Sequence, residues 1–337
     1  MRAFQLASLS IDALEQTDVP TPQPAADEVL MRLRAASLNY LDLMVAQGHL
    51  GDARLPSFIP GTDGAGEIVE LGSRVAGWAV GDRVVAGLIV DWVSGPIGRA
   101  NSQRLRGVSM PGSLADYAVV PARALVRLPD HLSFLEAATL PIAATTAWNA
   151  LRAAQIGPGD VVVLLGTGGV SLFALQFAKA IGARVIITSS SDGKLERART
   201  LGADVTINYR TTPAWDEEVL AATDGAGGKL IVETVGPATF ARSVNAAAAA
   251  GTIYTVGFVS GMELTIPLLP ILLKTLRIIG SNTGSTADLA ETVRAITELK
   301  IRPVIDSTFA FGSTRDAYRL LSEASHFGKV AIDITQR

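Results

Sequence analysis

A short apolar run followed at once by glycines constrains the fold of this chain most strongly. Residues 161–165, VVVLL, have the pattern of a strand buried on both faces. The glycine-rich residues 166–169, GTGG, follow directly. The next stretch carries apolar residues at helical spacing and stops at Gly182, the expected helix C-cap. This order of strand, glycine turn and helix predicts the first part of a βαβ unit.

The pattern of strand and helix continues beyond this turn. A second strand is expected at 185–188, a second helix at 194–201 and a third strand at 205–207. Alternation of this kind extends from about residue 130 to residue 280. It predicts an α/β region of the Rossmann type, with a doubly wound parallel sheet.

The glycine turn predicts a dinucleotide site. Gly166 permits the tight turn, and Gly168 lets the backbone approach a pyrophosphate. The following helix presents free N–H groups and the positive end of its dipole. The third position of the fingerprint is Ser171, where Gly or Ala is usual, and serine adds one small atom there. The residues expected to bind the pyrophosphate are Gly166, Thr167, Gly168, Gly169 and Val170.

The end of the second strand indicates which dinucleotide is preferred. An acid at this position would bind the ribose hydroxyls of NAD, but the strand ends on Ser189. A serine does not repel a 2′-phosphate, so NADP(H) is the expected cofactor, with its phosphate end near Ser190, Lys194 and Tyr209. The alternative is Asp192, which either turns back to a ribose or N-caps the helix that begins near Gly193.

Composition excludes several other classes. The chain of 337 residues has no cysteine, so disulfides and thiolate zinc sites are excluded. Its net charge of −3 argues against a nucleic-acid or anionic-membrane partner. No apolar run approaches the roughly 18 residues that span a bilayer. The start of the chain also lacks the pattern of a signal peptide. We therefore expect a soluble cytoplasmic protein with no bound metal.

Short motifs outside the central region carry a family resemblance. The flanks read as short strands divided by Gly and Asp turns. Over nearly its full length the chain resembles a zinc-free medium-chain dehydrogenase/reductase, in the branch of the quinone oxidoreductases and alcohol-dehydrogenase-like proteins. The matching motifs, in order, are NYLD (39–42), PGTDGAG (60–66), VGDRV (80–84), ATTAW (144–148), GTGGVS (166–171), LGAD (201–204) and HFGKV (326–330).

The resemblance implies a domain arrangement. It places a GroES-like, mostly β substrate domain at residues 1–128 and 282–337, built from both chain ends. The Rossmann domain then covers residues 129–281. It also implies an active site between the two domains, and a homodimer formed by edge pairing of the Rossmann sheets.

The chain differs from the zinc-dependent members of this family at the positions of the metal ligands. Those members have Cys at the position of Asn39, His-Glu at Thr62-Asp63 and another Cys at Ile142. All of these ligand positions are replaced here. A charge that develops on the substrate must then be met by hydrogen-bond donors or a proton relay.

The candidate catalytic residues lie near the first motif. They are the Asn39 amide, the Tyr40 hydroxyl and His49. Each also has a structural interpretation, because Asn39 is a good N-cap for a helix over 40–47, Tyr40 can simply pack, and His49 can be a surface turn residue.

The resemblance also assigns the nicotinamide end of the cofactor. It places six small or apolar residues beside the nicotinamide and its ribose: Thr146, Val235, Gly236, Val256, Gly257 and Phe258. Packing at the sheet ends is the alternative for these. Lys329 in the last motif is expected to reach a cofactor phosphate, or to be a surface lysine.

These interpretations predict an NADPH-preferring oxidoreductase. Its acceptor would be a small carbonyl compound: a quinone, an enone, an aldehyde or a ketone. The absence of zinc ligands favours quinone or enone reduction over interconversion of alcohols and ketones, because alcohol oxidation benefits most from a metal-bound alkoxide. A cofactor-binding protein with little catalysis remains the alternative from another class.

Overall fold

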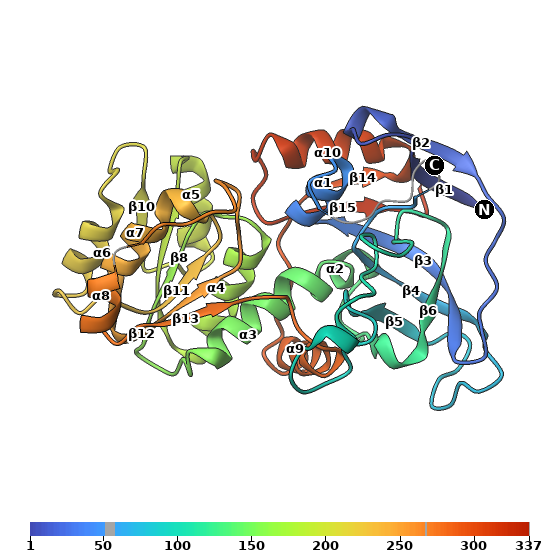
Figure 1. The fold of residues 1–337 in the computed structure, drawn as a ribbon, viewed down its shortest axis with the longest axis horizontal. Helices are drawn as coiled ribbons and strands as arrows, with labels where there is room; N and C mark the ends of the chain where they lie inside the picture. Colours follow the sequence, from blue (N-terminus) through green and yellow to red (C-terminus); the bar gives the residue numbers. More distant parts are fainter. Residues whose placement is uncertain (51–57, 267, 337) are drawn as a thin grey trace. The chain divides into compact units, whose positions relative to one another are not determined.

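The computed structural model describes residues 1–50, 58–266 and 268–336. It divides into two compact units, each of which is treated by itself. Unit 1 comprises Met1–Thr145 and Thr283–Arg337, and unit 2 comprises Thr146–Asn282 (Figure 1). Unit 1 is therefore assembled from both ends of the chain, and unit 2 from one continuous segment.

Unit 2 is built on a six-stranded sheet with the order β10-β9-β8-β11-β12-β13. Every neighbouring pair is parallel. Counted from β8, this is the order 3-2-1-4-5-6 of a Rossmann sheet, in which ligands bind at the carboxyl ends of the strands. The strands are β8 (Val161–Leu164), β9 (Arg184–Ser189), β10 (Val205–Asn208), β11 (Gly228–Glu233), β12 (Ala247–Thr255) and β13 (Arg277–Gly280).

Helices cover both faces of this sheet, and Figure 1 shows α4 on one face and α6 and α7 on the other. The helices are α3 (Thr145–Ala153), α4 (Gly169–Ile181), α5 (Asp192–Thr200), α6 (Trp215–Ala222), α7 (Pro237–Ala246) and α8 (Leu268–Leu273). Strand residues such as Val163, Ile186 and Ile231 are buried in one apolar cluster with Phe240 of α7. The expected α/β fold with a parallel sheet is confirmed.

Unit 1 is mostly β structure. Its seven-stranded sheet has the order β14-β15-β3-β4-β5-β7, and β6 also pairs with β3. A two-stranded sheet of β1 and β2 accompanies it. The strands are β1 (Arg2–Leu6), β2 (Leu14–Asp18), β3 (Glu28–Leu38), β4 (Asp63–Leu71), β5 (Arg83–Ala86), β6 (Tyr117–Pro121), β7 (Leu125–Arg127), β14 (Ile305–Ala310) and β15 (Lys329–Asp333).

Helices and short helical turns accompany this sheet. The α-helices are α1 (Tyr40–Ala46), α2 (Phe134–Ala137), α9 (Thr286–Glu298) and α10 (Thr314–Ser322). The tighter or wider turns are η1 (Ile11–Ala13), η2 (Arg99–Asn101), η3 (Ala122–Ala124), η4 (Leu140–Ala144) and η5 (Phe311–Ser313). Met31, Leu33 and Phe311 share one buried core with Tyr318 of α10. Among the described helices of the whole chain, none is long and apolar enough to cross a bilayer.

The register of three neighbouring strands positions one group of polar residues. β15 pairs antiparallel with β3, with Val330 opposite Leu38. β3 pairs antiparallel with β4, with Ser37 opposite Asp63. The end of β3 therefore lies beside the starts of β15 and β4, which brings Asn39, Lys329 and Asp63 to the same edge of the sheet.

Candidate active site

The glycine turn of unit 2 is shaped to admit a ligand. Gly166 has a φ of +72°, a conformation that residues with a Cβ rarely adopt. A Cβ added at Gly166 or at Gly168 would meet no atom within 4 Å. Space is therefore open beside the turn, and a side chain at either position would fill it.

The first turn of α4 supplies donors at this open space. The first four N–H groups of a helix have no partner within the helix, and the N-cap Gly168 offers no side chain to cap them. The hydroxyl of Ser171 donates to the Leu165 carbonyl oxygen at 2.8 Å, and the Thr234 hydroxyl donates to the same oxygen at 2.7 Å. These bonds fix the turn against β8 and β11, between which the strand order reverses. Residues 166–170 thus fit a pyrophosphate.

The expected adenosine end lies where β9 and β10 finish. Asn208 is the register partner of Ser189, and the Tyr209 N–H donates to the Ser189 carbonyl oxygen at 3.1 Å. Ser189 is buried, Ser190 and Lys194 are half-buried, and Tyr209 is exposed. The structure therefore brings the predicted residues of this end together at one edge of the sheet. Their contact with a 2′-phosphate stays a prediction.

The role expected for Asp192 as an N-cap is wrong. The hydroxyl of Ser191 accepts a hydrogen bond from the Lys194 N–H and caps α5, and Asp192 is the first residue of the helix. The Asp192 carboxylate instead accepts a hydrogen bond from the Asn208 side-chain amide at 2.7 Å. Contact of this carboxylate with a ribose stays a prediction.

The loops expected at the nicotinamide end are organised by Glu233, which the sequence analysis missed. Its buried carboxylate accepts hydrogen bonds from the N–H groups of Val235 and Gly236. Its backbone carbonyl oxygen accepts from the N–H groups of Val256 and Gly257. One residue at the end of β11 therefore positions four of the predicted residues. An acid at the end of a buried apolar strand was the signal.

Two glycines of these loops lie close to neighbouring backbone atoms. A Cβ at Gly257 would come within 1.8 Å of the Thr234 carbonyl oxygen, so no larger residue fits without moving the backbone. A Cβ at Gly236 would lie 3.2 Å from the Cα of Phe258. The remaining predicted residue, Thr146, is buried near the start of α3. Nicotinamide contacts for all of these stay predictions.

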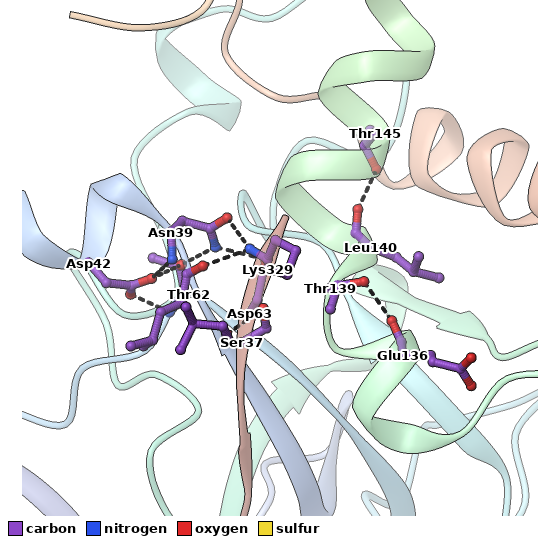
Figure 2. Close-up of polar contacts among 12 residues, drawn as sticks. Ser37, Asn39, Asp42, Thr62, Asp63, Glu136, Thr139, Leu140, Thr145 and Lys329 are labelled. Atoms are coloured by element: carbon purple, nitrogen blue, oxygen red, sulfur yellow. Dashed lines mark hydrogen bonds and ion pairs between the residues drawn. The ribbon is translucent and has the colours of Figure 1, made fainter. Parts of the chain in front are cut away.

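Unit 1 holds a buried polar cluster at the edge where β3, β4 and β15 meet, drawn in Figure 2. Its centre is the side chain of Asn39. The Asn39 amide donates to the Asp63 carboxylate at 2.8 Å and to the Thr62 hydroxyl at 3.1 Å. Its carbonyl oxygen accepts from the Lys329 ammonium at 2.6 Å. Asn39 is the N-cap of α1 by position, but its side chain makes no cap hydrogen bond. Both amide N–H bonds are already donated, which leaves none for a substrate.

Asp42 ties this cluster to α1. Its carboxylate accepts from the Thr62 N–H at 2.8 Å, the Thr62 hydroxyl at 2.9 Å and the Asn39 N–H at 2.8 Å. Burial raises the pKa of Asp42, and these hydrogen bonds and the charge of Lys329 oppose the rise. The buried Tyr318 of α10 faces the same carboxylate, and its pKa is raised by burial and by the charge of Asp42. Asp42 therefore fixes the geometry of the cluster.

Lys329 supplies the positive charge of the cluster. Its side chain is 3% exposed, and its ammonium donates to the Leu38 carbonyl oxygen at 2.7 Å as well as to Asn39. The Asp63 carboxylate forms an ion pair with it at 3.7 Å. The ammonium is buried among acceptors of unit 1, and its expected contact with a cofactor phosphate stays a prediction. The alternative of a surface lysine is wrong.

A second buried cation balances the charges. Arg106 is fully buried and donates from Nη2 to the Ser113 hydroxyl at 2.9 Å. Its Nε and Nη1, and Oδ1 of Asp63, have no hydrogen-bond partner among the described residues. Burial lowers the pKa of Arg106 to about 10, and the charge of Asp63 opposes this shift.

The same burial acts on the carboxyl group of Asp63 and raises its pKa to about 7. Lys329, the Asn39 amide and Arg106 oppose the shift, and Asp42 adds to it. Burial also lowers the pKa of Lys329, against the charges of Asp63 and Asp42. The cluster therefore pairs two acids with two cations in a low-dielectric environment.

The two other candidate catalytic residues lie at the surface of unit 1. Tyr40 is 37% exposed at the first position of α1. His49 is exposed beyond the end of α1, where its N–H donates to the Met44 carbonyl oxygen at 2.8 Å. Of the three predicted residues, the structure thus brings only Asn39 into the buried cluster. Catalytic roles for Tyr40 and His49 stay predictions.

Comparison with known proteins agrees with both units. Residues 25–130 match the family model of the alcohol dehydrogenase GroES-like domain, and residues 169–298 match that of zinc-binding dehydrogenases. A zinc-type alcohol dehydrogenase-like protein of Schizosaccharomyces pombe is 42% identical, covering 96% of both chains. The crystal structure of an NAD-dependent alcohol dehydrogenase is 35% identical, with a TM-score of 0.91 over 99% of this chain and 100% of the other. The quinone oxidoreductase of Coxiella burnetii is 27% identical, with a TM-score of 0.79 and 99% of each chain covered.

The chain belongs to the medium-chain dehydrogenase/reductase family. It is therefore an oxidoreductase with a GroES-like unit and a Rossmann unit, as the sequence motifs indicated.

The zinc ion that the family description implies does not fit the residues present. The ligand positions hold Asn39, Thr62 and Asp63, which offer an amide, a hydroxyl and one carboxylate in place of Cys and His. The Asn39 oxygen already accepts from Lys329. A divalent cation here would also be repelled by the ammonium, which lies 3.7 Å from the Asp63 carboxylate.

Proposed function

We propose that this chain is an NADPH-preferring, zinc-independent oxidoreductase that reduces a quinone, an enone or another carbonyl acceptor. The observation that carries the proposal is the open glycine turn at the end of β8, with Ser189 in place of an acid at the end of β9. A carboxylate there would repel the 2′-phosphate of NADPH, and a serine does not. Because one relative is described as NAD-dependent, the choice of cofactor is the sharpest point to test.

Each group of predicted cofactor residues would bind one part of the dinucleotide. Bound NADPH supplies the hydride. The glycine turn and the N-terminus of α4 would hold the pyrophosphate, and Ser189, Ser190 and Lys194 would meet the phosphate of the adenosine end. The loops fixed by Glu233 would support the nicotinamide.

The test compares cofactors before acceptors. Isothermal titration should give tighter binding of NADPH than of NADH, by about tenfold or more, because a 2′-phosphate adds charge-assisted hydrogen bonds. NADPH oxidation is then followed with quinones, enones, aldehydes and ketones. Tighter binding of NADH would contradict the cofactor assignment. Binding of NADPH without turnover of any acceptor would favour the cofactor-binding protein.

Interconversion of alcohols and ketones is the second candidate, and the names of the relatives favour it. The two candidate reactions are distinguished by measuring the oxidation of a simple alcohol. An alcohol dehydrogenase reduces NADP⁺ when supplied with a simple alcohol, whereas an enone or quinone reductase has no such substrate. Turnover with a secondary alcohol at a rate comparable to ketone reduction would establish this second candidate.

The partner that we propose is a second copy of this chain. Helix α8 carries four leucines, each 62–75% exposed: Leu268, Leu269, Leu272 and Leu273. The adjoining strand β13 is at the edge of the sheet, and Ile278 on it is also exposed. An exposed apolar helix beside a strand with unpaired edge N–H and C=O groups is typical of an interface. In a symmetric dimer, β13 of the second copy would supply matching hydrogen bonds, and its α8 would supply matching leucines.

Light scattering coupled to size exclusion tests this assembly. Wild type should run as a dimer, and Leu272→Glu should run as a monomer, because a carboxylate cannot be buried against leucines without a partner. Val80→Glu, at an equally exposed apolar residue of unit 1, is the matched control and should remain dimeric. A monomeric wild type would contradict the proposal.

A further inference from the structure

Glu233, at the end of β11, is a buried acid that forms no ion pair with a described lysine, arginine or histidine. Its carboxylate accepts hydrogen bonds from the N–H groups of Val235 at 2.9 Å and Gly236 at 3.0 Å. It also accepts from the hydroxyls of Thr239, at 2.8 Å, and Ser243. All four donors are neutral. Within the described part of the chain, dipoles alone therefore stabilise this negative charge.

The start of α7 supplies one of these dipoles. The helix begins at Pro237, and its N-cap Gly236 has no side chain to accept from the first N–H groups. The Glu233 carboxylate lies at this end, where it accepts from the Gly236 N–H and the Thr239 hydroxyl. The positive end of the helix dipole therefore faces the carboxylate, which stabilises a negative charge without neutralising it.

The same residue joins the two loops that are expected at the nicotinamide. Its carboxylate holds the loop after β11, and its carbonyl oxygen accepts from the N–H groups of Val256 at 2.8 Å and Gly257 at 3.2 Å, after β12. Because β11 and β12 are parallel neighbours, both loops leave the sheet at its carboxyl edge. All of these residues belong to unit 2. A nicotinamide ring on these loops would lie close to a negative charge that no described cation cancels.

We propose that Glu233 tunes the redox potential of the bound cofactor, because its charge stabilises the cationic ring of NADP⁺ over the neutral ring of NADPH. This inference rests on the proposed function. The C4–H bond of the dihydronicotinamide breaks, its hydride forms a C–H bond on the acceptor, and the ring gains one positive charge. The displaced π electron pair moves to the acceptor oxygen, which takes a proton from water. NADPH thereby loses two electrons and the acceptor gains them.

A fixed anion favours this step in one direction. The ring is neutral before hydride transfer and positive after it, so a nearby negative charge stabilises the product side and the charge that develops on the way. Since the carboxylate is already held by its four donors, it needs no reorganisation as that charge appears. Bound NADPH is therefore a stronger reductant than it would be beside a neutral side chain.

The test neutralises Glu233 with little change of shape. In Glu233→Gln, the side-chain oxygen can still accept from Val235, Gly236 and Thr239, which all donate to one oxygen in the wild type. The new amide donates to the Ser243 hydroxyl, which rotates to accept it. Isothermal titration then measures the affinities for NADP⁺ and NADPH.

Only the charged form of the cofactor should respond strongly. Affinity for NADP⁺ should fall roughly tenfold, the order of effect of a unit charge at roughly 8–10 Å in a protein. Affinity for NADPH should stay within about threefold of wild type. The potential of the bound couple would then rise by about 30 mV, the equivalent of a tenfold change for two electrons. Equal losses of both affinities would overturn the proposal, because Glu233 would then only hold the loops.

Glu233→Asp is the matched control, since it keeps the charge and shortens the reach of the carboxylate. It should weaken binding of NADP⁺ and NADPH alike, because the loops lose hydrogen bonds. The ratio of the two affinities should stay within about threefold of wild type. If the ratio changes as much as in Glu233→Gln, the proposal is overturned, because the charge is then not the cause.

A second pair of variants leaves Glu233 in place. Thr239 is half-buried in the first turn of α7, so a longer side chain can reach solvent there. Thr239→Lys brings an ammonium beside the carboxylate and should weaken NADP⁺ binding severalfold relative to NADPH. Thr239→Met is long but uncharged and should keep the wild-type ratio. Equal ratios in these two variants would overturn the proposal, even if Glu233→Gln does not fold.

Further ligands distinguish failure of this inference from failure of the proposed function. The 2′-phosphate of ADP-ribose lacks the nicotinamide ring and should bind wild type and Glu233→Gln equally. If wild type prefers NAD⁺ and NADH, the cofactor assignment fails, and the same ratio is measured with those two because the ring is the same. A wild type that binds none of these dinucleotides would overturn the proposed function and this inference together. An unchanged ratio in a Glu233→Gln variant that binds its cofactor would overturn the role of Glu233 alone.

Discussion

The two units arrange their polar groups in opposite ways. Unit 2 leaves main-chain N–H groups uncapped by a side chain at the start of α4, beside glycines whose missing side chains leave open space. Unit 1 gathers charged side chains, Asp42, Asp63, Lys329 and Arg106, all buried in one cluster. Main-chain groups are present whatever the sequence, so only the absence of a side chain matters there. Buried charges are stable only as a complete set, so each member matters.

The largest effect is expected when one member of the buried set is removed. Lys329→Met leaves Asp63 buried without its partner and should lower the free energy of unfolding by about 3–5 kcal/mol. The matched control is Lys179→Met, since Lys179 pairs with Asp204 at 2.8 Å on the surface of unit 2. It should lose about 1 kcal/mol or less. Urea unfolding measures both, and equal losses would remove the contrast between the units.

The next effect is a dependence of stability on pH that belongs to unit 1. The folded pKa of Asp63 is raised to about 7, above its ordinary value. The folded state therefore holds this proton more tightly, and stability falls as pH rises from the ordinary carboxyl range to about 7. Lys329, Asp42 and Arg106 face this carboxyl group.

The measurement is the free energy of unfolding of wild type minus that of Asp63→Asn, at several pH values. This difference should fall by a few kcal/mol as pH rises across that range, because asparagine does not titrate. A difference that stays flat, or that rises with pH, would show that Asp63 is ionised throughout.

Filling the open space in unit 2 should affect binding and leave folding nearly intact. Gly168→Val places a side chain where no atom lies within 4 Å. NADPH affinity should fall by about 100-fold, while stability changes by only about 1 kcal/mol, the usual cost of a poor N-cap. Gly98→Val is the control, because Gly98 is also an N-cap glycine with open space, in unit 1. If both variants bind NADPH like wild type, the glycine turn does not hold the cofactor.

The smallest effect concerns the choice between two cofactors. Ser189→Asp should weaken NADPH binding by about tenfold and improve NADH binding, because a carboxylate repels the 2′-phosphate and accepts from ribose hydroxyls. Ser189→Asn has the same shape without the charge and should keep the wild-type preference. Titration of both cofactors into the three proteins checks this. An unchanged preference in Ser189→Asp would place the 2′-phosphate elsewhere.

The sequence predicted unit 2 well because its signals are local. The strand, the glycines and the helix of residues 161–182 are continuous, and the structure reproduces them as β8, the turn and α4. The prediction was wrong in finer details where two neighbouring residues can both take one role, as Ser191 and Asp192 can at the N-cap of α5. The exposed leucines of α8 were also missed, because an apolar run is the same in a core and in an interface.

The cluster of unit 1 was only partly predictable, because its members are far apart in sequence. Asn39 was named, but its partner Lys329 lies 290 residues away, and strand pairing alone brings them together. Arg106 lies in a stretch without periodicity, where no pattern indicates burial. Glu233, at the end of a buried apolar strand, was not named by the sequence analysis.

The position of β15 in the sheet has a consequence for synthesis. This strand lies between β14 and β3, although it is made long after β3. Residues 146–282 can fold as they leave the ribosome, since they form a unit of their own. The N-terminal part must wait, with Asp42, Asp63 and Arg106 already present and the second cation of the cluster, Lys329, still untranslated. Until Lys329 is synthesised, burial of the two acids of the nascent chain costs free energy that the complete cluster would offset. A chain that ends before Lys329 would therefore have a folded Rossmann unit and an incompletely folded unit 1.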